Sequence, residues 1–189
     1  RSAYTISASG GVTIIIGPDG TDRVVNVERL QFADGLYDVA GEPFGRVLNG
    51  TAGNDILDGT AGPDTLSGLE GDDTINGLAG DDFINGGGGA DVMRGGIGND
   101  TYYVDSSSDV VIEVSGEGSD RVATSVSFTM AAGQAIETLE VINSSSTENI
   151  NLVGNAFDQL ISGNAGTNYL SGDDGIDGLS GYAGDDVLN

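Results

Sequence analysis

The sequence predicts an all-β solenoid made of short stacked coils. Residues 50–103 divide without a gap into six units of nine residues: GTAGNDILD, GTAGPDTLS, GLEGDDTIN, GLAGDDFIN, GGGGADVMR and GGIGNDTYY. Every unit has Gly at positions 1 and 4, Asp at position 6 and a large apolar or aromatic residue at position 8. Two glycines in each unit exclude a stable helix, and a fixed period of this kind is typical of repeat architectures.

Each unit divides into a glycine-rich turn and a short strand. Because neighbouring strand residues point to opposite faces, we expect position 8 to point inward and positions 7 and 9 to point outward. Two units then make one coil with a strand on each side, and each unit stacks on the second unit after it. Successive coils should lie about 4.8 Å apart.

This stacking arranges the position-6 aspartates in two columns. One column holds Asp55, Asp73 and Asp91, and the other holds Asp64, Asp82 and Asp100. Carboxylates at strand spacing repel each other, so we expect a cation between them. Ca²⁺ fits best, because it takes oxygen ligands that include backbone carbonyls, whereas Mg²⁺ prefers to keep waters. The chain has no Cys and no His for softer metals.

We expect folding to be coupled to calcium binding. Six position-8 side chains make a small core against the entropy of ordering the repeats, so the ions should contribute to folding. The sequence thus predicts a disordered ion-free chain and a folded calcium-bound chain. Two gaps in each column of three aspartates give about four ions in this block, and a later block adds one or two.

The G-G-x-G-x-D-x-apolar-x pattern resembles the repeats-in-toxin (RTX), or haemolysin-type calcium-binding, family. The resemblance implies a right-handed parallel β-roll in which position-6 carboxylates and turn carbonyls hold Ca²⁺. The carboxylate ligands that it implies are Asp55, Asp64, Asp73, Asp82, Asp91, Asp100, Asp177 and Asp186. The carbonyl ligands that it implies are Gly53, Gly62, Gly71, Gly80, Gly89 and Gly98 at position 4, and Thr51, Thr60, Leu69 and Leu78 at position 2. The family prefers Gly at position 2, and this departure is mild if position 2 supplies only its carbonyl.

Residues 1–49 lack the period and read as a β-rich lead-in that caps the roll. Strands are expected at Tyr4–Ala8, Val12–Ile16, Val24–Val27, Glu28–Phe32 and Leu36–Val39, with turns at Gly17–Gly20 and at Asp34-Gly35. The phrase VNVERLQFADGLYDVA resembles a segment that precedes haemolysin-type repeats in long secreted proteins.

Residues 104–153 interrupt the period. Strands are expected at Val110–Val114, Val122–Phe128, Leu139–Ile142 and Ile150–Val153. They either continue the solenoid as wider, irregular coils, which we favour, or form a small β spacer between two rolls. Asp105 and Asp109 are the best candidates here for an additional ligand, because they follow the last regular turn.

Residues 154–189 resume the repeats as GNAFDQLIS, GNAGTNYLS, GDDGIDGLS and GYAGDDVLN. Position 6 holds Gln159 and Asn168 before Asp177 and Asp186. An amide oxygen can bind Ca²⁺ but adds no charge. Gln159 and Asn168 therefore either bind Ca²⁺ weakly or form uncharged hydrogen-bond ladders between coils, and this block is a weaker second roll.

Composition excludes several functions. The net charge is −24 with only six Lys and Arg residues, so no basic patch is available for nucleic acid or an anionic membrane. Without His or Cys there is no catalytic triad or zincin motif, and neither G-x-S-x-G nor a phosphate loop occurs. We expect no enzyme activity, and the oligomeric state is not indicated.

The resemblance implies a calcium-binding module of a larger secreted bacterial protein. Such proteins leave Gram-negative cells through type I secretion machinery and fold on Ca²⁺ outside, and the first residue, Arg1, suits an excised fragment. Two alternatives remain: an adhesive cell-surface region that binds a glycan or another cell, and an accessory domain of an extracellular enzyme whose catalytic domain lies elsewhere. Only scattered aromatic residues, such as Phe83 and Tyr103, support adhesion.

Overall fold

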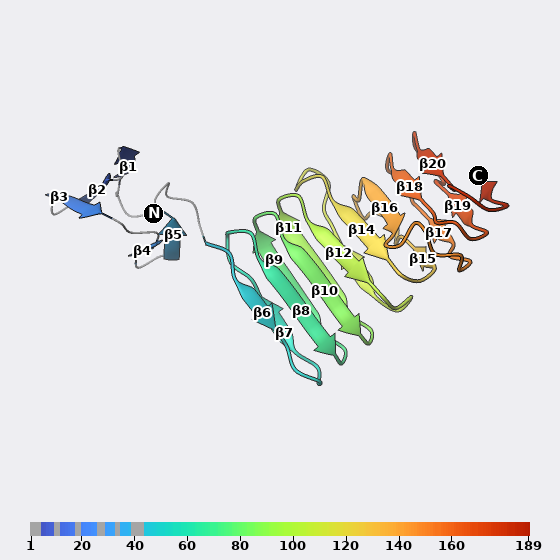
Figure 1. Cartoon of the computed structure of the whole chain (residues 1–189), viewed down its shortest axis with the longest axis horizontal. Helices are drawn as coiled ribbons and strands as arrows, with labels where there is room; N and C mark the ends of the chain where they lie inside the picture. Colours follow the sequence, from blue (N-terminus) through green and yellow to red (C-terminus); the bar gives the residue numbers. More distant parts are fainter. Residues whose placement is uncertain (1–4, 10–11, 18–19, 26–28, 33–34, 39–43) are drawn as a thin grey trace. The chain divides into compact units, whose positions relative to one another are not determined.

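The computed structural model describes residues 5–9, 12–17, 20–25, 29–32, 35–38 and 44–189. All regular elements in these ranges are β-strands (Figure 1). No helix in this part of the chain is long and apolar enough to cross a membrane. The chain divides into two compact units, Arg1–Gly45 and Arg46–Asn189, which are treated separately.

The first unit contains antiparallel strands. A three-stranded sheet is formed in chain order by β1 (Thr5–Ser9), β2 (Val12–Gly17) and β3 (Gly20–Val25). A separate hairpin pairs β4 (Arg29–Phe32) with β5 (Gly35–Asp38). Residues 18, 19 and 34 of the two predicted turns lie outside the described residues, and the capping role of this unit stays a prediction.

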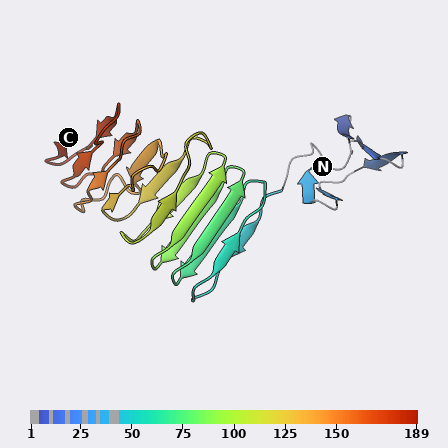
Figure 2. The ribbon, with the colours of Figure 1, turned by 180° about the vertical axis from the view of Figure 1, so that it is seen from behind.

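The second unit is a parallel β-solenoid, as the nine-residue period predicts. An eight-stranded parallel sheet runs along it and supplies one strand to each coil, in the order β20-β18-β16-β14-β12-β10-β8-β6. Its strands are β6 (Val47–Asn49), β8 (Thr65–Glu70), β10 (Phe83–Gly88), β12 (Thr101–Val104), β14 (Arg121–Thr124), β16 (Thr138–Val141), β18 (Leu160–Ser162) and β20 (Gly178–Ser180). Seen from behind, the coils follow one another from cyan to red (Figure 2).

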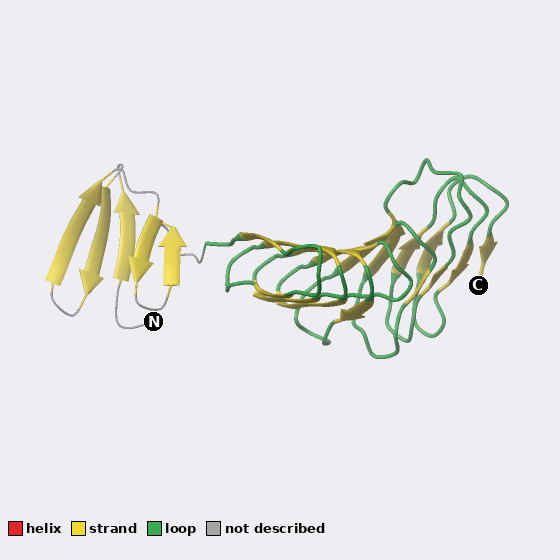
Figure 3. Ribbon diagram, turned by 90° about the horizontal axis from the view of Figure 1, so that it is seen from below, coloured by secondary structure: helices red, strands yellow, loops and turns green. Residues whose placement is uncertain are grey.

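The opposite layer of the roll consists of two four-stranded parallel sheets. The first contains β7 (Ile56–Asp58), β9 (Thr74–Ala79), β11 (Val92–Ile97) and β13 (Val110–Ile112). The second contains β15 (Phe128–Thr129), β17 (Leu152–Val153), β19 (Tyr169–Ser171) and β21 (Val187–Leu188). Viewed from below, turns connect the two strand layers of the roll at both edges (Figure 3).

The strand register gives the length of each coil. Ile84 of β10 pairs with Leu66 of β8 on one side and with Tyr102 of β12 on the other. Each unit therefore stacks on the second unit after it, and equivalent turn residues are 18 positions apart. This spacing becomes 20 between Asp100 and Asp120, so the strands of residues 104–153 continue the roll as coils of irregular length.

One strand prediction in this irregular region is wrong. Val122–Phe128 is not a single strand, because β14 ends at Thr124 and β15 begins at Phe128 in a different sheet. Thr124 Oγ1 accepts a hydrogen bond from Val126 N at 3.1 Å and donates to Val126 O at 2.9 Å. This local turn bends the chain from one layer of the roll to the other.

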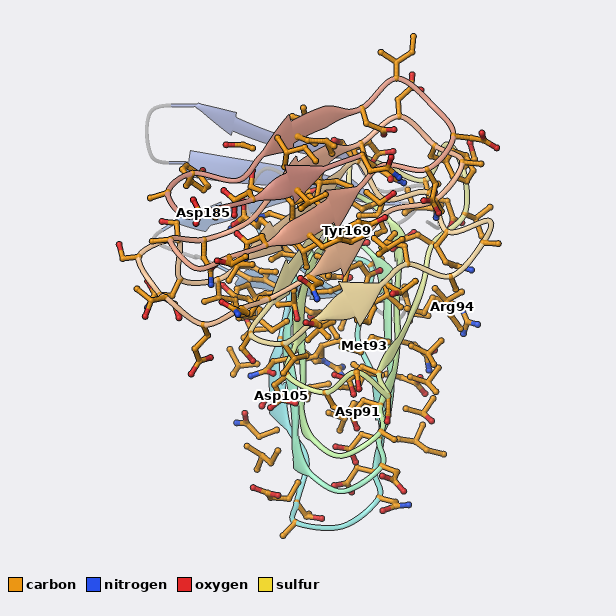
Figure 4. The ribbon with its side chains drawn as sticks, turned by 90° about the vertical axis from the view of Figure 1, so that its right-hand side faces the viewer. Asp91, Met93, Arg94, Asp105, Tyr169 and Asp185 are labelled. Atoms are coloured by element: carbon orange, nitrogen blue, oxygen red, sulfur yellow. The ribbon has the colours of Figure 1, made fainter. Side chains whose placement is uncertain are left out.

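The core is a stack of inward-pointing residues between the two layers. The position-8 residues from the second unit to the sixth are fully buried: Leu66, Ile75, Ile84, Met93 and Tyr102. The same core continues into the later coils with Val122, Leu139, Ile161 and Leu170. Met93 lies inside the coils, whereas its neighbour Arg94 points outward (Figure 4).

Candidate metal centre

The turns bring the position-6 aspartates into two columns. Within a column, the backbone N–H of one aspartate donates to Oδ1 of the aspartate in the next coil, over 2.7 Å from Asp64 to Asp82 and 2.8 Å from Asp73 to Asp91. The first column contains Asp55, Asp73, Asp91 and Asp109, each just before a strand of the β7-β9-β11-β13 sheet. The second contains Asp64, Asp82, Asp100 and Asp120, each just before a strand of the long sheet.

Each column is one aspartate longer than the repeats alone indicate. Asp109 follows Asp91 at the usual spacing of 18 and is buried, whereas Asp105, the other candidate in this segment, is exposed. Asp120 lies 20 residues after Asp100, so a search at the regular period misses it. Burial raises the pKa of Asp109, and it raises the pKa of Asp120 to about 6.

The second carboxylate oxygen, Oδ2, is buried without a hydrogen-bond donor in four repeat aspartates. Among the described residues these are Asp73, Asp82, Asp91 and Asp100, and each exposes at most 2% of its surface. Burial raises the pKa of Asp82 to about 7 and the pKa values of Asp91 and Asp100 to about 6. The backbone hydrogen bond to Oδ1 opposes this rise in pKa, and neighbouring carboxylates add to it. Buried carboxylates of this kind need a cation or a proton to neutralise them.

Backbone carbonyls surround these unpaired oxygens. A side-chain carbon on Gly68, at position 1, would collide with both Asp73 Oδ2 and the carbonyl oxygen of Gly86 in the next coil. A side-chain carbon on Gly77 would likewise collide with Asp82 Oδ2 and with the carbonyl oxygen of Gly95 in the next coil. Glycine at position 1 thus leaves a space lined by oxygen atoms, which suits a hard cation such as Ca²⁺. The ligands predicted from the sequence do not include these position-1 carbonyls. The glycine that every unit has at position 1 could have indicated them.

The family model of the RTX calcium-binding nonapeptide repeat matches the chain in four copies, over residues 49–84, 67–102, 77–111 and 162–189. These stretches of the chain are RTX calcium-binding nonapeptide repeats. RTX repeats bind Ca²⁺, and the aspartate columns of the first block lie within the matched residues up to Asp109. The searches of curated proteins and of solved structures give no match.

The backbone at position 2 is left-handed in the last four turns of the first RTX block. The φ angle is +80° at Leu69 and +81° at Leu78, close to the +86° of Gly87 and the +96° of Gly96. A left-handed conformation costs a residue with a side chain about 1–2 kcal/mol. Leucine at position 2 therefore costs conformational energy, even if only its backbone carbonyl binds the ion. Glycine at this position avoids that cost.

The predicted carbonyl ligands of the later RTX turns lie between successive coils. A side-chain carbon on Gly87 or Gly96 would strike the carbonyl oxygen of Leu69 or Leu78, respectively, in the coil before. At position 4, the carbonyls of Gly71 and Gly80 face Gly89 and Gly98 in the same way. Both sets of carbonyls thus border the gaps between coils, while the assignment of individual ligands stays a prediction.

The first two RTX turns are built differently. Thr51 donates its N–H, at 2.5 Å, and its hydroxyl, at 2.9 Å, to Asp55 Oδ2. Thr60 does the same for Asp64, and each hydroxyl accepts the N–H of the position-4 glycine, Gly53 or Gly62. These two aspartates therefore have hydrogen-bond donors that the four later ones lack.

In the second RTX block, uncharged amide side chains replace two of the position-6 carboxylates. Asn168 Nδ2 donates to the carbonyl of Ile150 at 2.7 Å and to Asn164 Oδ1 at 2.8 Å, and Asn168 Oδ1 accepts the N–H of Asn164 at 2.9 Å. In the preceding unit, Gln159 Oε1 accepts the N–H of Asn155 at 3.1 Å and Gln159 Nε2 donates to Asn155 Oδ1 at 2.6 Å. Of the two alternatives left by the sequence, the structure has the uncharged network, most of it within the turn. Asp177 and Asp186 accept the backbone N–H of Gln159 and Asn168 and are only half-buried.

Proposed function

We propose that the chain is a calcium-locked module of a secreted protein, whose roll is completed only when Ca²⁺ fills the two aspartate columns. The four buried Oδ2 atoms carry this proposal, because no donor among the described residues neutralises them. The ligand set that we propose has Asp73, Asp82, Asp91 and Asp100 at its centre. Asp55 and Asp64, with the turn carbonyls, complete it in the first block, and Asp177 and Asp186 are its members in the second block.

The energy of burying these carboxylates supports coupled folding. One pKa unit corresponds to about 1.4 kcal/mol, so moving Asp82 from its ordinary 3.8 to about 7 destabilises the ion-free roll by about 4 kcal/mol at pH 8. A whole domain is stable by only about 5–15 kcal/mol. Several such carboxylates therefore remove most of the stability of the first block unless a cation binds.

Coupled folding also explains how such a module suits secretion. A chain with a net charge of −24 and 33 glycines repels itself and stays extended when calcium is scarce, as it is inside a cell. An extended chain suits passage through type I secretion machinery. Extracellular calcium modules bind in roughly the 10⁻⁴–10⁻³ M range, so the roll would form after export and act as a rigid structural element.

The experiment is circular dichroism of the purified chain during a calcium titration and after chelation. We expect little β-signal from the repeats in EDTA at pH 8, a cooperative rise on adding millimolar Ca²⁺, and reversal by EDTA. A chain that is fully β-folded in excess chelator at this pH would overturn the proposal.

A second candidate function is adhesion. Phe83 and Tyr103 lie on neighbouring strands of the long sheet, and their ring centroids are 4.5 Å apart on the outward face. Phe83 is 40% exposed. The pair offers a small aromatic platform that favours binding to a glycan or to another cell surface. Glycan-array binding that disappears in Phe83→Ala would support adhesion, whereas no binding would leave a structural or enzyme-accessory role.

A further inference from the structure

Two aromatic rings project from the outward face of the long sheet. Phe83 lies between Thr65 and Thr101 in one row of outward residues. Tyr103 lies in the next row, directly beside Ala123. The rings of Phe83 and Tyr103 contact each other, with centroids 4.5 Å apart. Because the side chains of Thr65, Thr101 and Ala123 are smaller, the two rings stand above them and form one continuous apolar surface.

The roll itself does not require an aromatic ring at this place. Position 7 of the neighbouring coils holds threonine, a smaller residue that suits a β-strand equally well. Phe83 is 40% exposed, and the core is made by the inward residues of position 8. An aromatic pair that lies outside the core is available to an apolar face of a ligand.

Polar groups lie beside the rings. Asn85 is in register with Tyr103 on the neighbouring strand. Asn76 holds the same repeat position in the opposite layer, where its amide contacts Asp58 and Arg94. The Asn85 amide and the Tyr103 hydroxyl, by contrast, make no hydrogen bond to any residue that the structure describes. A free amide and a free hydroxyl beside an apolar surface suit the hydroxyl groups of a sugar, which both donate and accept.

An ion pair lies on the other side of the rings. Arg121 on β14 pairs with Glu140 on β16. Ala123 lies in register between Tyr103 and Glu140 and is 1% exposed, so larger side chains cover it. The ion pair cancels its own charge, while the chain as a whole carries a net charge of −24. This surface should therefore repel an anionic ligand and accept an uncharged one.

We propose that the outward face of β10, β12, β14 and β16 binds a neutral polysaccharide chain that runs across the strands. Its sugar rings stack on Phe83 and Tyr103, and its hydroxyl groups bond to Asn85 and to the pair of Arg121 and Glu140. The strands are about 4.8 Å apart, close to the length of one hexose in an extended chain, so successive sugars meet successive strands.

The proposed sugar site depends on calcium. Its four strands belong to four successive coils, so the site is assembled only in the folded roll. The inference rests on the adhesion candidate, to which it adds the ligand class. It rests on the calcium-locked roll for its regulation.

Calorimetry with defined sugar oligomers tests the ligand class. The neutral probes are cellohexaose, maltohexaose and mannohexaose, the acidic probe is a hyaluronan oligosaccharide, and all titrations use the whole chain in millimolar Ca²⁺. We expect at least one neutral oligomer to bind and hyaluronan not to bind. Failure of all three neutral oligomers to bind would overturn the proposal. Binding of hyaluronan alone would overturn the neutral ligand class and keep adhesion.

Matched variants locate the site. Phe83→Thr introduces the residue of the neighbouring coils, so the roll should fold, and Tyr103→Ala removes the second ring. We expect each to weaken sugar binding roughly tenfold, and Asn85→Ala to weaken it several-fold. Tyr169→Ala is the control, because Tyr169 is also 40% exposed but lies on β19 in the opposite layer. Wild-type affinity in both ring variants would place the sugar elsewhere and overturn the site.

Circular dichroism of the same samples separates this proposal from the calcium-locked function. We expect EDTA to abolish both the β-signal of the repeats and the sugar binding. A roll that folds on Ca²⁺ but binds no neutral oligomer would refute the sugar site alone. A chain that is β-folded and binds the sugar in EDTA would refute the calcium lock and support the sugar site.

Discussion

Replacing Asp82 with Asn should have opposite effects with and without calcium. Asp82 is 2% exposed, its Oδ1 accepts the N–H of Asp64, and its Oδ2 is unpaired. Asn keeps the Oδ1 acceptor and removes the charge. Asn occurs at the same repeat position in the second block, where Asn168 accepts the N–H of Asn164 in its own turn and donates to the carbonyl of Ile150.

The magnitude follows from the pKa of Asp82. Its folded-state pKa of about 7 lies above the ordinary 3.8, so the folded state binds the proton more tightly than the unfolded state. Protonation of Asp82 therefore makes its full contribution to the free energy of unfolding below about pH 4, and this contribution is lost as the pH rises to about 7. At pH 8 in EDTA, Asp82→Asn should therefore stabilise the roll by up to about 4 kcal/mol. In saturating Ca²⁺ the same variant should be destabilised, because it has lost a charged ligand.

Urea unfolding followed by circular dichroism, in EDTA and in Ca²⁺, measures both signs. Asp81→Asn is the matched control, because Asp81 is exposed in the same turn and its Oδ1 accepts the N–H of Asn99 at 2.8 Å. The control should leave both stabilities nearly unchanged. If Asp82→Asn destabilises the chain equally in EDTA and in Ca²⁺, the Asp82 carboxylate is not a calcium ligand that lacks its ion in EDTA, and the reasoning fails.

Three further predictions concern the proton, the left-handed turn and the amide coils. In EDTA the wild-type chain should show more β-signal at pH 5 than at pH 8, because protons replace Ca²⁺ on carboxylates with raised pKa values; equal signals would contradict this. Leu69→Gly should stabilise the calcium-bound roll by about 1 kcal/mol in urea unfolding, since φ is +80° and the side chain is 46% exposed. Ile56→Gly on β7, where φ is not positive, should destabilise it, and the same sign in both would refute the role of φ. Hydrogen exchange in EDTA should protect the amides around Asn164 and Asn168 longer than those of residues 68–100, and the reverse order would mean that the amide network does not replace the ions.

Much of this fold follows from the period alone. Gly at positions 1 and 4 and an apolar residue at position 8 are enough to predict parallel coils with Ile75, Ile84 and Met93 in the core. Constant spacing is also enough to predict the aspartate columns, because two units per coil leave one possible stacking. These features depend on residues that are close together in the sequence, and every unit repeats the same residue pattern.

The remaining features depend on contacts that the period does not encode. Asp120 joins a column through a coil of 20 residues, and Glu113 reaches the column from the place of a repeat glycine. Asp120 departs from the 18-residue spacing, whereas Glu113 keeps that spacing from Gly95 but is a glutamate where the repeats have glycine. The left-handed backbone of Leu69 is likewise invisible from composition, because leucine normally avoids it. The sequence reduced the role of Asn168 to two alternatives, and only its hydrogen-bond partners decide between them.

The most direct test of the calcium columns is a crystal structure of the chain grown with Ca²⁺, with anomalous difference maps that locate the ions. We predict anomalous peaks within bonding distance of the Oδ2 atoms of Asp73, Asp82, Asp91 and Asp100, between successive coils and beside the position-1 carbonyls. A roll with the same coils but without ions at these four oxygens, at neutral pH, would contradict the account.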